Sequence, residues 1–280
     1  MDLLIEKGSE IVKLSEFGFY HIAIAESSPS TGLSRRNVKG RNGFIFDGVT
    51  FNEKTISVSA RIAVENLRAY YQKIDALRGF LYGETPFYIT KIVPTNTDLY
   101  DFELPGQKEG DFLDQKVVLT KWHYRHKVVV DGDISFSFMG KSSQGLKYNV
   151  SFKFTTVELP YGETIPKTIT LSGGTIPYAG TAKLSQLEWP FIVEMISSGN
   201  QAGFYLEIDG RRFTYTQVGD LNSGDTFKLT GIETRKNGSV VNNKTNYAYF
   251  ELTPKRNGTL KYETNFNGTI KLLNFVELYQ

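Results

Sequence analysis

The sequence predicts a mainly β protein built from two domains, and three observations support this. Aromatic residues are abundant, with 20 Phe and 16 Tyr among 280 residues, and large flat side chains favour the faces of sheets. Short segments that alternate between apolar and polar residues recur along the chain, with turn signals between them. One segment, 150–167, begins as such a strand and then contains Pro160, Gly162 and Pro166, which is typical of a domain boundary.

The composition indicates a folded protein and excludes several classes of function. Hydrophobic residues are 40% and charged residues 22% of the chain, as in globular proteins. The net charge is +2, and no long run of Lys or Arg indicates a nucleic-acid-binding surface. The chain has no cysteine, so disulfides, thiolate metal sites and cysteine nucleophiles are excluded. The start of the chain lacks the pattern of a signal peptide, and no apolar run approaches about 18 residues, so we expect no membrane segment.

The first domain, residues 1–158, is predicted to combine strands with one helix and a hairpin arm. Apolar residues recur at helical spacing over 64–82, and Gly83 is a natural helix stop. Asp47-Gly48 between apolar segments 44–46 and 49–51 predicts a hairpin turn, because both residues tolerate the positive φ of a primed turn. Asp131-Gly132 predicts a second turn. The other segments with strand periodicity are 3–6, 17–25, 55–62, 87–93, 100–104, 116–124, 127–130, 134–138 and 148–157.

The second domain, residues 159–280, is predicted to contain strands alone. Segments with strand periodicity are 168–171, 176–182, 191–196, 204–208, 213–216, 226–232, 247–252, 259–262 and 269–278. Turn pairs lie between them at Gly173-Gly174, Asp209-Gly210, Asn237-Gly238, Asn257-Gly258 and Asn267-Gly268. Many short strands with regularly spaced turn signals describe a β-sandwich.

A polar segment, 27–43, is predicted to be a loop and carries Arg35, Arg36, Lys39 and Arg41. It is long for a compact domain, and loops of this length are usually functional or disordered. Two interpretations remain open, a solvated surface loop and a contact arm for a neighbouring subunit. Residue spacing does not distinguish between them.

The histidines do not predict a metal or catalytic site. The chain has three, His21, His123 and His126. Residues three apart on a strand point to opposite faces, so His123 and His126 are poorly placed to share a metal ion. We expect all three to be structural or exposed histidines.

Paired carboxylates are the remaining candidates for catalysis. Asp101 with Glu103, and Asp131 with Asp133, have the same-face spacing of a strand, as a glycoside hydrolase would require. Each pair lies beside a turn signal, where acidic residues are common. No phosphate-binding glycine loop or nucleophile elbow is present in the sequence. We therefore predict that the protein is not an enzyme and has no catalytic residue, metal or cofactor.

The order of motifs in the second half resembles the C-terminal galectin-like domain of siphophage distal tail proteins, the Dit family. The motifs are Ile-Pro-Tyr-Ala-Gly-Thr-Ala at 176–182, the hairpin 204–215, Ser-Gly-Asp-Thr-Phe-Lys-Leu at 223–229, the turn 236–239, the segment 249–260 and the closing strand 268–275. The first half is similar to the same family in its polar loop, its hairpin and its one helix followed by Leu81-Tyr82-Gly83. The segment 152–161 is similar to the family's domain junction.

This resemblance implies a structural protein of the virion, located at the tail tip and assembled in the cytoplasm of a bacterial host. Members of the family form a homo-hexameric ring that joins the tail tube to the baseplate or tail-tip proteins. The implied partners are a tail tube protein, a tail-associated hub or fibre protein, and receptor-binding proteins, with no specific nucleic acid and no membrane. The N-terminal domain is implied to make the ring, and the galectin-like domain to project outward.

The expected subunit interface is formed by Phe44, Phe46 and Phe51 together with Arg35 and Arg36. A ring needs heterologous contacts, in which one surface of each subunit meets a different surface of the next. As an alternative, the basic side chains of 27–43 would face a DNA-conducting lumen, where tight unspecific binding would obstruct passage.

Pro160, Gly162 and Pro166 are the expected interdomain hinge. Proline fixes φ and glycine frees the backbone, so this segment would set how the second domain stands relative to the first.

The main alternative is a carbohydrate-binding β-sandwich that takes part in adhesion to the host surface. Its aromatic candidates are Trp122, Trp189, Tyr205 and Tyr215. Aromatic side chains on a sheet belong more often to the core than to a ligand site.

Overall fold

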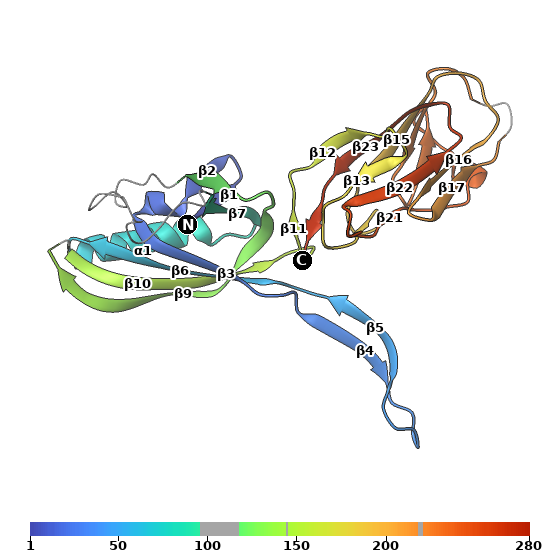
Figure 1. Ribbon diagram of the computed structural model, residues 1–280. Helices are drawn as coiled ribbons and strands as arrows, with labels where there is room; N and C mark the ends of the chain where they lie inside the picture. The colour runs from blue at the N-terminus through green and yellow to red at the C-terminus, as the bar shows by residue number, and fades with distance from the viewer. Residues whose placement is uncertain (96–117, 144, 218–220) are drawn as a thin grey trace, which may run out of the picture. The chain divides into compact units, whose positions relative to one another are not determined.

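Strands dominate both halves of the computed structural model, which describes residues 1–95, 118–143, 145–217 and 221–280. The chain divides into two compact units, Met1–Pro160 and Tyr161–Gln280 (Figure 1). Among the described residues, one α-helix is present, and it lies in the first unit. The prediction of a mainly β fold with one N-terminal helix is confirmed.

The first unit is built on one large sheet with the strand order β2-β1-β7-β9-β10-β6-β3, and β8 adds to β7. Its strands are β1 (Asp2–Lys7), β2 (Glu10–Lys13), β3 (Phe19–Glu26), β6 (Thr55–Val64), β7 (Phe87–Pro94), β8 (Leu119–Lys121), β9 (His126–Ser142) and β10 (Gly145–Thr156). Alternate residues of β10, from Tyr148 to Phe154, are buried, and those between them are exposed. This period of two places one face of the sheet on the core.

The helix α1 (Leu67–Leu81) covers the core face of this sheet through Ile74, Leu77 and Leu81, which are buried at helical spacing. The helix begins three residues later than the sequence pattern indicates. β6 continues to Val64, and the Asn66 side chain then accepts a hydrogen bond of 3.0 Å from the Ala69 N–H. An Asn at this position satisfies a backbone donor that the first helical turn leaves free. A short 3₁₀ turn, η1 (Leu14–Phe17), precedes β3.

Both predicted Asp-Gly turns of the first unit are wrong, because each pair lies inside a strand. Asp47-Gly48 belongs to β5 (Ile45–Phe51), which pairs with β4 (Thr31–Arg36), so the predicted loop 27–43 contains a strand. Asp131-Gly132 lies in the middle of β9. At both places the strand register shifts, as in a β-bulge. Bulges and primed turns both draw on glycine at positive φ, here +153° at Gly48 and +73° at Gly132, so the dipeptide alone does not separate them.

The second unit contains two larger sheets that face each other across a core. One has the order β12-β23-β15-β18-β19-β20 and the other β13-β22-β16-β17. Phe204 of β16 contacts Phe227 of β18, with ring centroids 5.0 Å apart. The strands are β12 (Lys167–Thr170), β13 (Thr175–Pro177), β15 (Ile192–Ser197), β16 (Phe204–Ile208), β17 (Arg211–Tyr215), β18 (Thr226–Leu229), β19 (Thr234–Lys236), β20 (Ser239–Val240), β22 (Thr259–Thr264) and β23 (Gly268–Phe275).

Two short ladders complete the second unit. β11 (Gly162–Glu163) pairs with β24 (Leu278–Tyr279), and β14 (Leu184–Ser185) pairs with β21 (Glu251–Leu252). The turn predictions at Asp209-Gly210 and Asn237-Gly238 are confirmed, because all four residues have positive φ and each pair joins adjacent strands. The predicted strand 247–252 is reduced to β21, and the predicted strand 100–104 lies outside the described residues.

Replacing Phe154 with Ala tests how much the core of the first unit contributes. Phe154 is fully buried and packs edge-on against Phe87 and Phe152. We expect Phe154→Ala to lower the free energy of unfolding of the first unit by about 3–5 kcal/mol, because it leaves a cavity. Thermal unfolding followed by circular dichroism measures this. The control Phe46→Ala, at a side chain 59% exposed, should change it by less than about 0.5 kcal/mol.

Candidate functional site

The hairpin β4–β5 has no buried core of its own. Every residue from 27 to 53 is exposed or half-buried. Its two strands form a separate sheet and pair with each other. It nevertheless carries large apolar side chains that are 41–59% exposed, namely Leu33, Val38, Phe44, Phe46, Val49 and Phe51. Exposed apolar side chains that gather on one surface are typical of an interaction site.

The bulge at Asp47-Gly48 places five of these side chains on one face. Leu33 pairs with Val49, and Arg35 pairs with Phe46 after the register shift. Residues directly opposite each other share a face, and residues two apart on a strand do so as well. In a regular ladder without this register shift, Phe46 would point away from Val49 and Phe51. We call Leu33, Phe44, Phe46, Val49 and Phe51 the arm face.

The two predicted arginines have different partners within the hairpin. Arg36 donates two hydrogen bonds to the Asp47 carboxylate across the strand pair, at 2.8 and 2.9 Å. This bidentate pair is exposed, so it contributes little to the stability of the fold. Its geometry orients the end of β4 relative to β5. The Arg35 guanidinium lies over the Phe44 ring, 5.5 Å from its centroid. All five residues predicted for a subunit interface lie on the hairpin or directly before β5, but Arg36, which pairs with Ile45, lies on the opposite face from Arg35 and Phe46.

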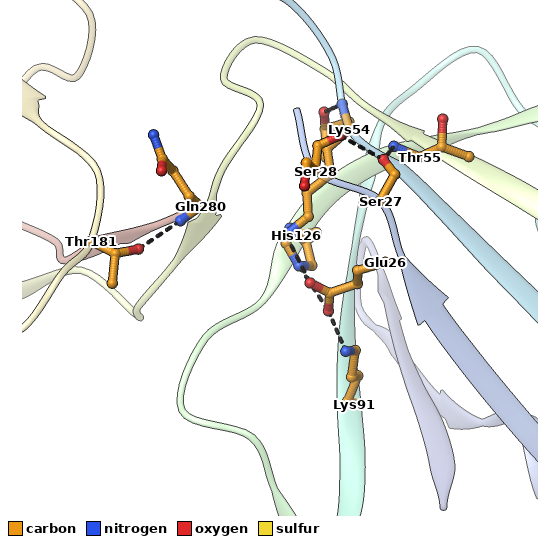
Figure 2. A network of polar contacts seen from close by, with 10 residues as sticks. Glu26, Ser27, Ser28, Lys54, Thr55, Lys91, His126, Thr181 and Gln280 are labelled. Carbon is orange, nitrogen blue, oxygen red and sulfur yellow. Dashed lines mark hydrogen bonds and ion pairs between the residues drawn. The ribbon is translucent and has the colours of Figure 1, made fainter. Parts of the chain in front are cut away.

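A buried ion cluster lies at the root of the hairpin (Figure 2). Glu26 is the last residue of β3 before the hairpin, and Lys54 is the first residue after it on the way to β6. The Glu26 carboxylate is 2.8 Å from Lys54 Nζ, 2.6 Å from Lys91 Nζ of β7 and 3.3 Å from His126 Nε2 of β9. The Lys54 side chain is 3% exposed and that of Glu26 is 10% exposed. The cluster therefore joins both ends of the hairpin to two other strands.

Hydrogen bonds donated by backbone N–H groups reinforce this root. The Lys54 N–H donates to Thr156 Oγ1 at 2.9 Å, and the Thr156 N–H donates back to the Lys54 carbonyl at 3.0 Å. Ser27 and Thr55 form a similar pair, in which the Ser27 N–H donates to the Thr55 carbonyl and the Thr55 N–H donates to Ser27 Oγ. The base of the hairpin is thereby tied to β10.

The charge of Glu26 follows from two opposing effects. Burial raises the pKa of Glu26, while the hydrogen bonds and charges of His126, Lys54 and Lys91 lower it by more, so its pKa lies well below the ordinary 4.5. A carboxyl group whose pKa is lowered on folding stabilises the folded state above its unfolded pKa. This contribution is complete above about pH 4.5 and is lost as the pH falls through the folded pKa.

The other candidate catalytic residues do not form a site. His21 and His123 are exposed, and His126 is the buried member of the ion cluster. Asp131 and Asp133 are exposed on either side of the β9 bulge, and Asp101 and Glu103 lie outside the described residues. In the part of the chain that the structure describes, no group of three or more His, Asp or Glu side chains is placed to hold a metal ion.

The aromatic candidates for sugar binding do not present a shared platform. Tyr215 is buried, and the Arg212 guanidinium lies over the Tyr205 ring at 4.3 Å. Trp189 is half-buried and donates from Nε1 to the Asn274 carbonyl at 2.9 Å. Trp122 is exposed but belongs to the first unit.

The predicted hinge residues fall on both sides of the boundary between the units. Pro160 is the last residue of the first unit. Gly162 begins β11 and is paired with Tyr279 of β24, while Pro166 directly precedes β12. No helix in the described residues is long and apolar enough to span a membrane.

Comparison with known proteins identifies the family. The model of the phage tail protein RIFT-related domain matches residues 7–146, which is half of the chain. The chain therefore belongs to this family of phage tail proteins. The search of curated proteins found no match.

One solved structure shows a shared fold. The crystal structure of the Dit protein (gp 19.1) of phage SPP1, described as a paradigm of the hub adsorption apparatus in phages that infect Gram-positive bacteria, is similar over 99% of both chains, with a TM-score of 0.62 and 12% identity. Two structures of the phage p2 baseplate in its activated conformation, with Sr and with Ca, match over 97% of both chains at a TM-score of 0.38, with 10% and 7% identity. The resemblance to siphophage distal tail proteins is confirmed at the level of family and fold.

Sequence reasoning identified the aromatic residues of the hairpin but missed its ion cluster. Glu26 and Lys54 are 28 residues apart, with an arm between them. A signal is present in the sequence, since Glu26 ends one strand and Lys54 precedes the next. The antiparallel pairing that brings these ends together becomes visible once 27–53 is recognised as a hairpin.

Replacing Glu26 with Gln tests the anchoring role of the cluster. The change leaves the buried Lys54 ammonium without its carboxylate, and breaking a buried ion pair in this way costs about 3–5 kcal/mol. We expect a lower melting temperature of the first unit and faster hydrogen exchange at the Ser27 and Thr55 amides. The exposed neighbour Glu53→Gln is the control. Stability unchanged in Glu26→Gln at pH 7 would contradict the anchoring role, and the double variant Glu26→Gln with Lys54→Met should regain most of the loss.

Proposed function

We propose that the protein forms a hexameric ring at the distal end of a siphophage tail and acts as the hub that joins the tail tube to the baseplate or tail-tip proteins. The observation that carries the proposal is the arm face, five large side chains on one side of a hairpin that has no core. The family match and the shared fold with a hub protein support it. In this role the protein is a structural component of the virion, assembled in the host cytoplasm, and not an enzyme.

The physical argument for a subunit contact concerns the stability of the hairpin. A two-stranded hairpin alone is marginally stable in water. Burying its apolar face against a neighbour contributes about 25 cal/mol for each Å² of apolar surface. The anchored root reduces the freedom that the hairpin loses on binding, and such preorganisation favours assembly.

The two units have different roles in this proposal. The first domain, residues 1–158, forms the ring through its hairpin, and the second, residues 159–280, is a galectin-like sandwich that contacts baseplate, fibre or receptor-binding proteins. Pro160, Gly162 and Pro166 form the hinge between them.

Polar replacement on the arm face tests the ring. We expect the double variant Phe46→Ser with Phe51→Ser to keep its fold and lose hexamers, because it removes apolar surface that is exposed in the subunit. Negative-stain images of the purified protein, alone and co-expressed with its tail tube protein, measure this as the fraction of six-fold rings. Ile11→Ser, at another exposed apolar side chain of the first unit, is the control. Normal rings from the double variant would rule out the arm face as the interface.

Replacing both hinge prolines tests the segment between the units. Gly at positions 160 and 166 removes the restriction on φ, so we expect a broader distribution of orientations of the second unit. Small-angle scattering, together with class averages of rings, measures that distribution. Pro254→Gly, within the second unit, is the control. An unchanged distribution would mean that the prolines serve only to end strands.

A further inference from the structure

Four Asn-Gly pairs occur in the chain, at 42–43, 237–238, 257–258 and 267–268. Asparagine is among the thermolabile residues, and a following glycine makes it more so. The backbone nitrogen of the glycine attacks Cγ of the asparagine carboxamide, and glycine has no side chain to obstruct the approach. The four pairs therefore offer the same reaction in four different structural surroundings.

The reaction is a deamidation with water as its co-reactant. The glycine nitrogen gives up its proton and forms a bond to Cγ, and the carboxamide nitrogen leaves as ammonia. Water then opens the resulting succinimide ring at either of its carbonyl groups. The product is aspartate or isoaspartate, so a neutral side chain becomes a carboxylate with no oxidation or reduction.

Exposure does not distinguish the four asparagines, because all of them are exposed. Local sequence does not separate them either, since the tripeptide Arg-Asn-Gly occurs both at 41–43 and at 256–258. The freedom of the carboxamide and of the following peptide group must decide. Ring closure requires these two groups to rotate toward each other, and hydrogen bonds that hold either group oppose the rotation.

The pair at 257–258 is held at both reacting groups. The Gly258 N–H donates to the Lys255 carbonyl at 3.0 Å, and Asn257 Oδ1 accepts from the Thr259 N–H at 3.3 Å. The nitrogen that would attack and the carboxamide that would receive the attack are thus both engaged elsewhere.

The carboxamide of Asn237 is fixed at both of its ends. Its Oδ1 accepts from the Thr226 N–H at 2.9 Å, and its Nδ2 donates to the Asp225 carboxylate at 2.7 Å. A hydrogen bond to a charged group is among the stronger ones. Cyclisation at this position must break both contacts.

The pair at 267–268 is held through its backbone. The Asn267 N–H donates to Gln201 Oε1 at 2.6 Å, and the Asn267 carbonyl accepts from the Ser198 N–H at 3.0 Å. Gly268 lies in β23, where a Cβ would come within 2.1 Å of the Ile196 carbonyl oxygen. Little room is left for the peptide rotation that ring closure needs.

Asn42-Gly43 lies at the tip of the hairpin, between β4 and β5 (Figure 1), and has none of these restraints. Within the described residues, neither the Asn42 carboxamide nor the Gly43 N–H has a hydrogen-bond partner. A Cβ at Gly43 would meet no atom within 4 Å. Both reacting groups are therefore free to rotate at an exposed loop tip.

We propose that Asn42-Gly43 is a site of spontaneous deamidation, which gives the tip of the hairpin a carboxylate as the protein ages. The new negative charge lies directly beside Arg41. Four cationic and two acidic residues give the segment 27–53 a net charge of +2, and the loss of the neutral carboxamide lowers it by one. The site uses only the folded subunit, so it is independent of the proposed ring.

Peptide mapping of the full-length protein by mass spectrometry tests the proposal. Incubation in isotopically labelled water at mildly alkaline pH marks each newly formed carboxyl group with an oxygen from the solvent. We expect position 42 to react at least about tenfold faster than positions 237, 257 and 267, because the restraints at those positions must open first. The rate should rise with pH, since the glycine nitrogen must lose its proton.

Two comparisons separate the effect of the structure from that of the sequence. In concentrated urea the chain unfolds, and all four positions should then react at similar rates. Asn42→Gln should remove the fast reaction of the folded protein, because glutamine must close a larger ring, and the matched control Asn257→Gln should leave it unchanged. Asn42→Asp has the charge of the product and should co-migrate with the aged wild-type protein in isoelectric focusing.

The proposal is overturned if position 42 reacts no faster than position 257 in the folded protein. A folded-state rate at position 42 more than about tenfold below its rate in urea would overturn it as well, because the hairpin tip would then restrain the pair. Neither result touches the proposed ring. Conversely, a wild-type protein that deamidates at position 42 but forms no ring would contradict the proposed function alone.

Discussion

The contact on which the rest of the proposed interface depends is the carboxylate of Glu26 among Lys54, Lys91 and His126. A long hairpin without a core presents its apolar face to a partner consistently only if the direction of the hairpin is fixed. The cluster lies at the base of the hairpin, where a small change in backbone direction would move the tip furthest. It also carries a penalty, because charges removed from water must all remain paired.

Two kinds of surface in the first unit have different physical origins. The core face of the sheet follows from period-two alternation, which buries Tyr148, Val150 and Phe152 beneath α1. The arm face follows from a register shift, which places side chains of odd and even number together. The first kind stabilises the monomer, and the second remains exposed until something binds it. The strand register thus determines both which side chains form the core and which side chains stay exposed on the hairpin.

The sequence predicted the fold class and the turns at Asp209-Gly210 and Asn237-Gly238 because those signals are local, whereas Gly268 of the predicted turn Asn267-Gly268 lies inside β23. Asp209-Gly210 has a turn at its own position, and the helix follows from the spacing of Ile74, Leu77 and Leu81. The prediction failed where one local signal serves two structures, as at Asp47-Gly48, and where distant residues meet. The aromatic rings of the hairpin were identified without the bulge that aligns them. Glu26 and Lys54 look like ordinary surface charges until the pairing of β3 with β6 is known.

The bulge at Asp47-Gly48 makes the arm face depend on register more than on composition. A regular ladder with the same residues would keep every apolar side chain of the hairpin but place Phe46 on the other side of the ribbon from Val49 and Phe51. The hairpin would then have two weaker apolar faces in place of one. Removing Asp47 would abolish the bulge and still leave Phe46 opposite Arg35 on the arm face, because Phe46 would then directly precede Gly48. A change of register at this point would thus alter the arm face more than the loss of the extra residue itself.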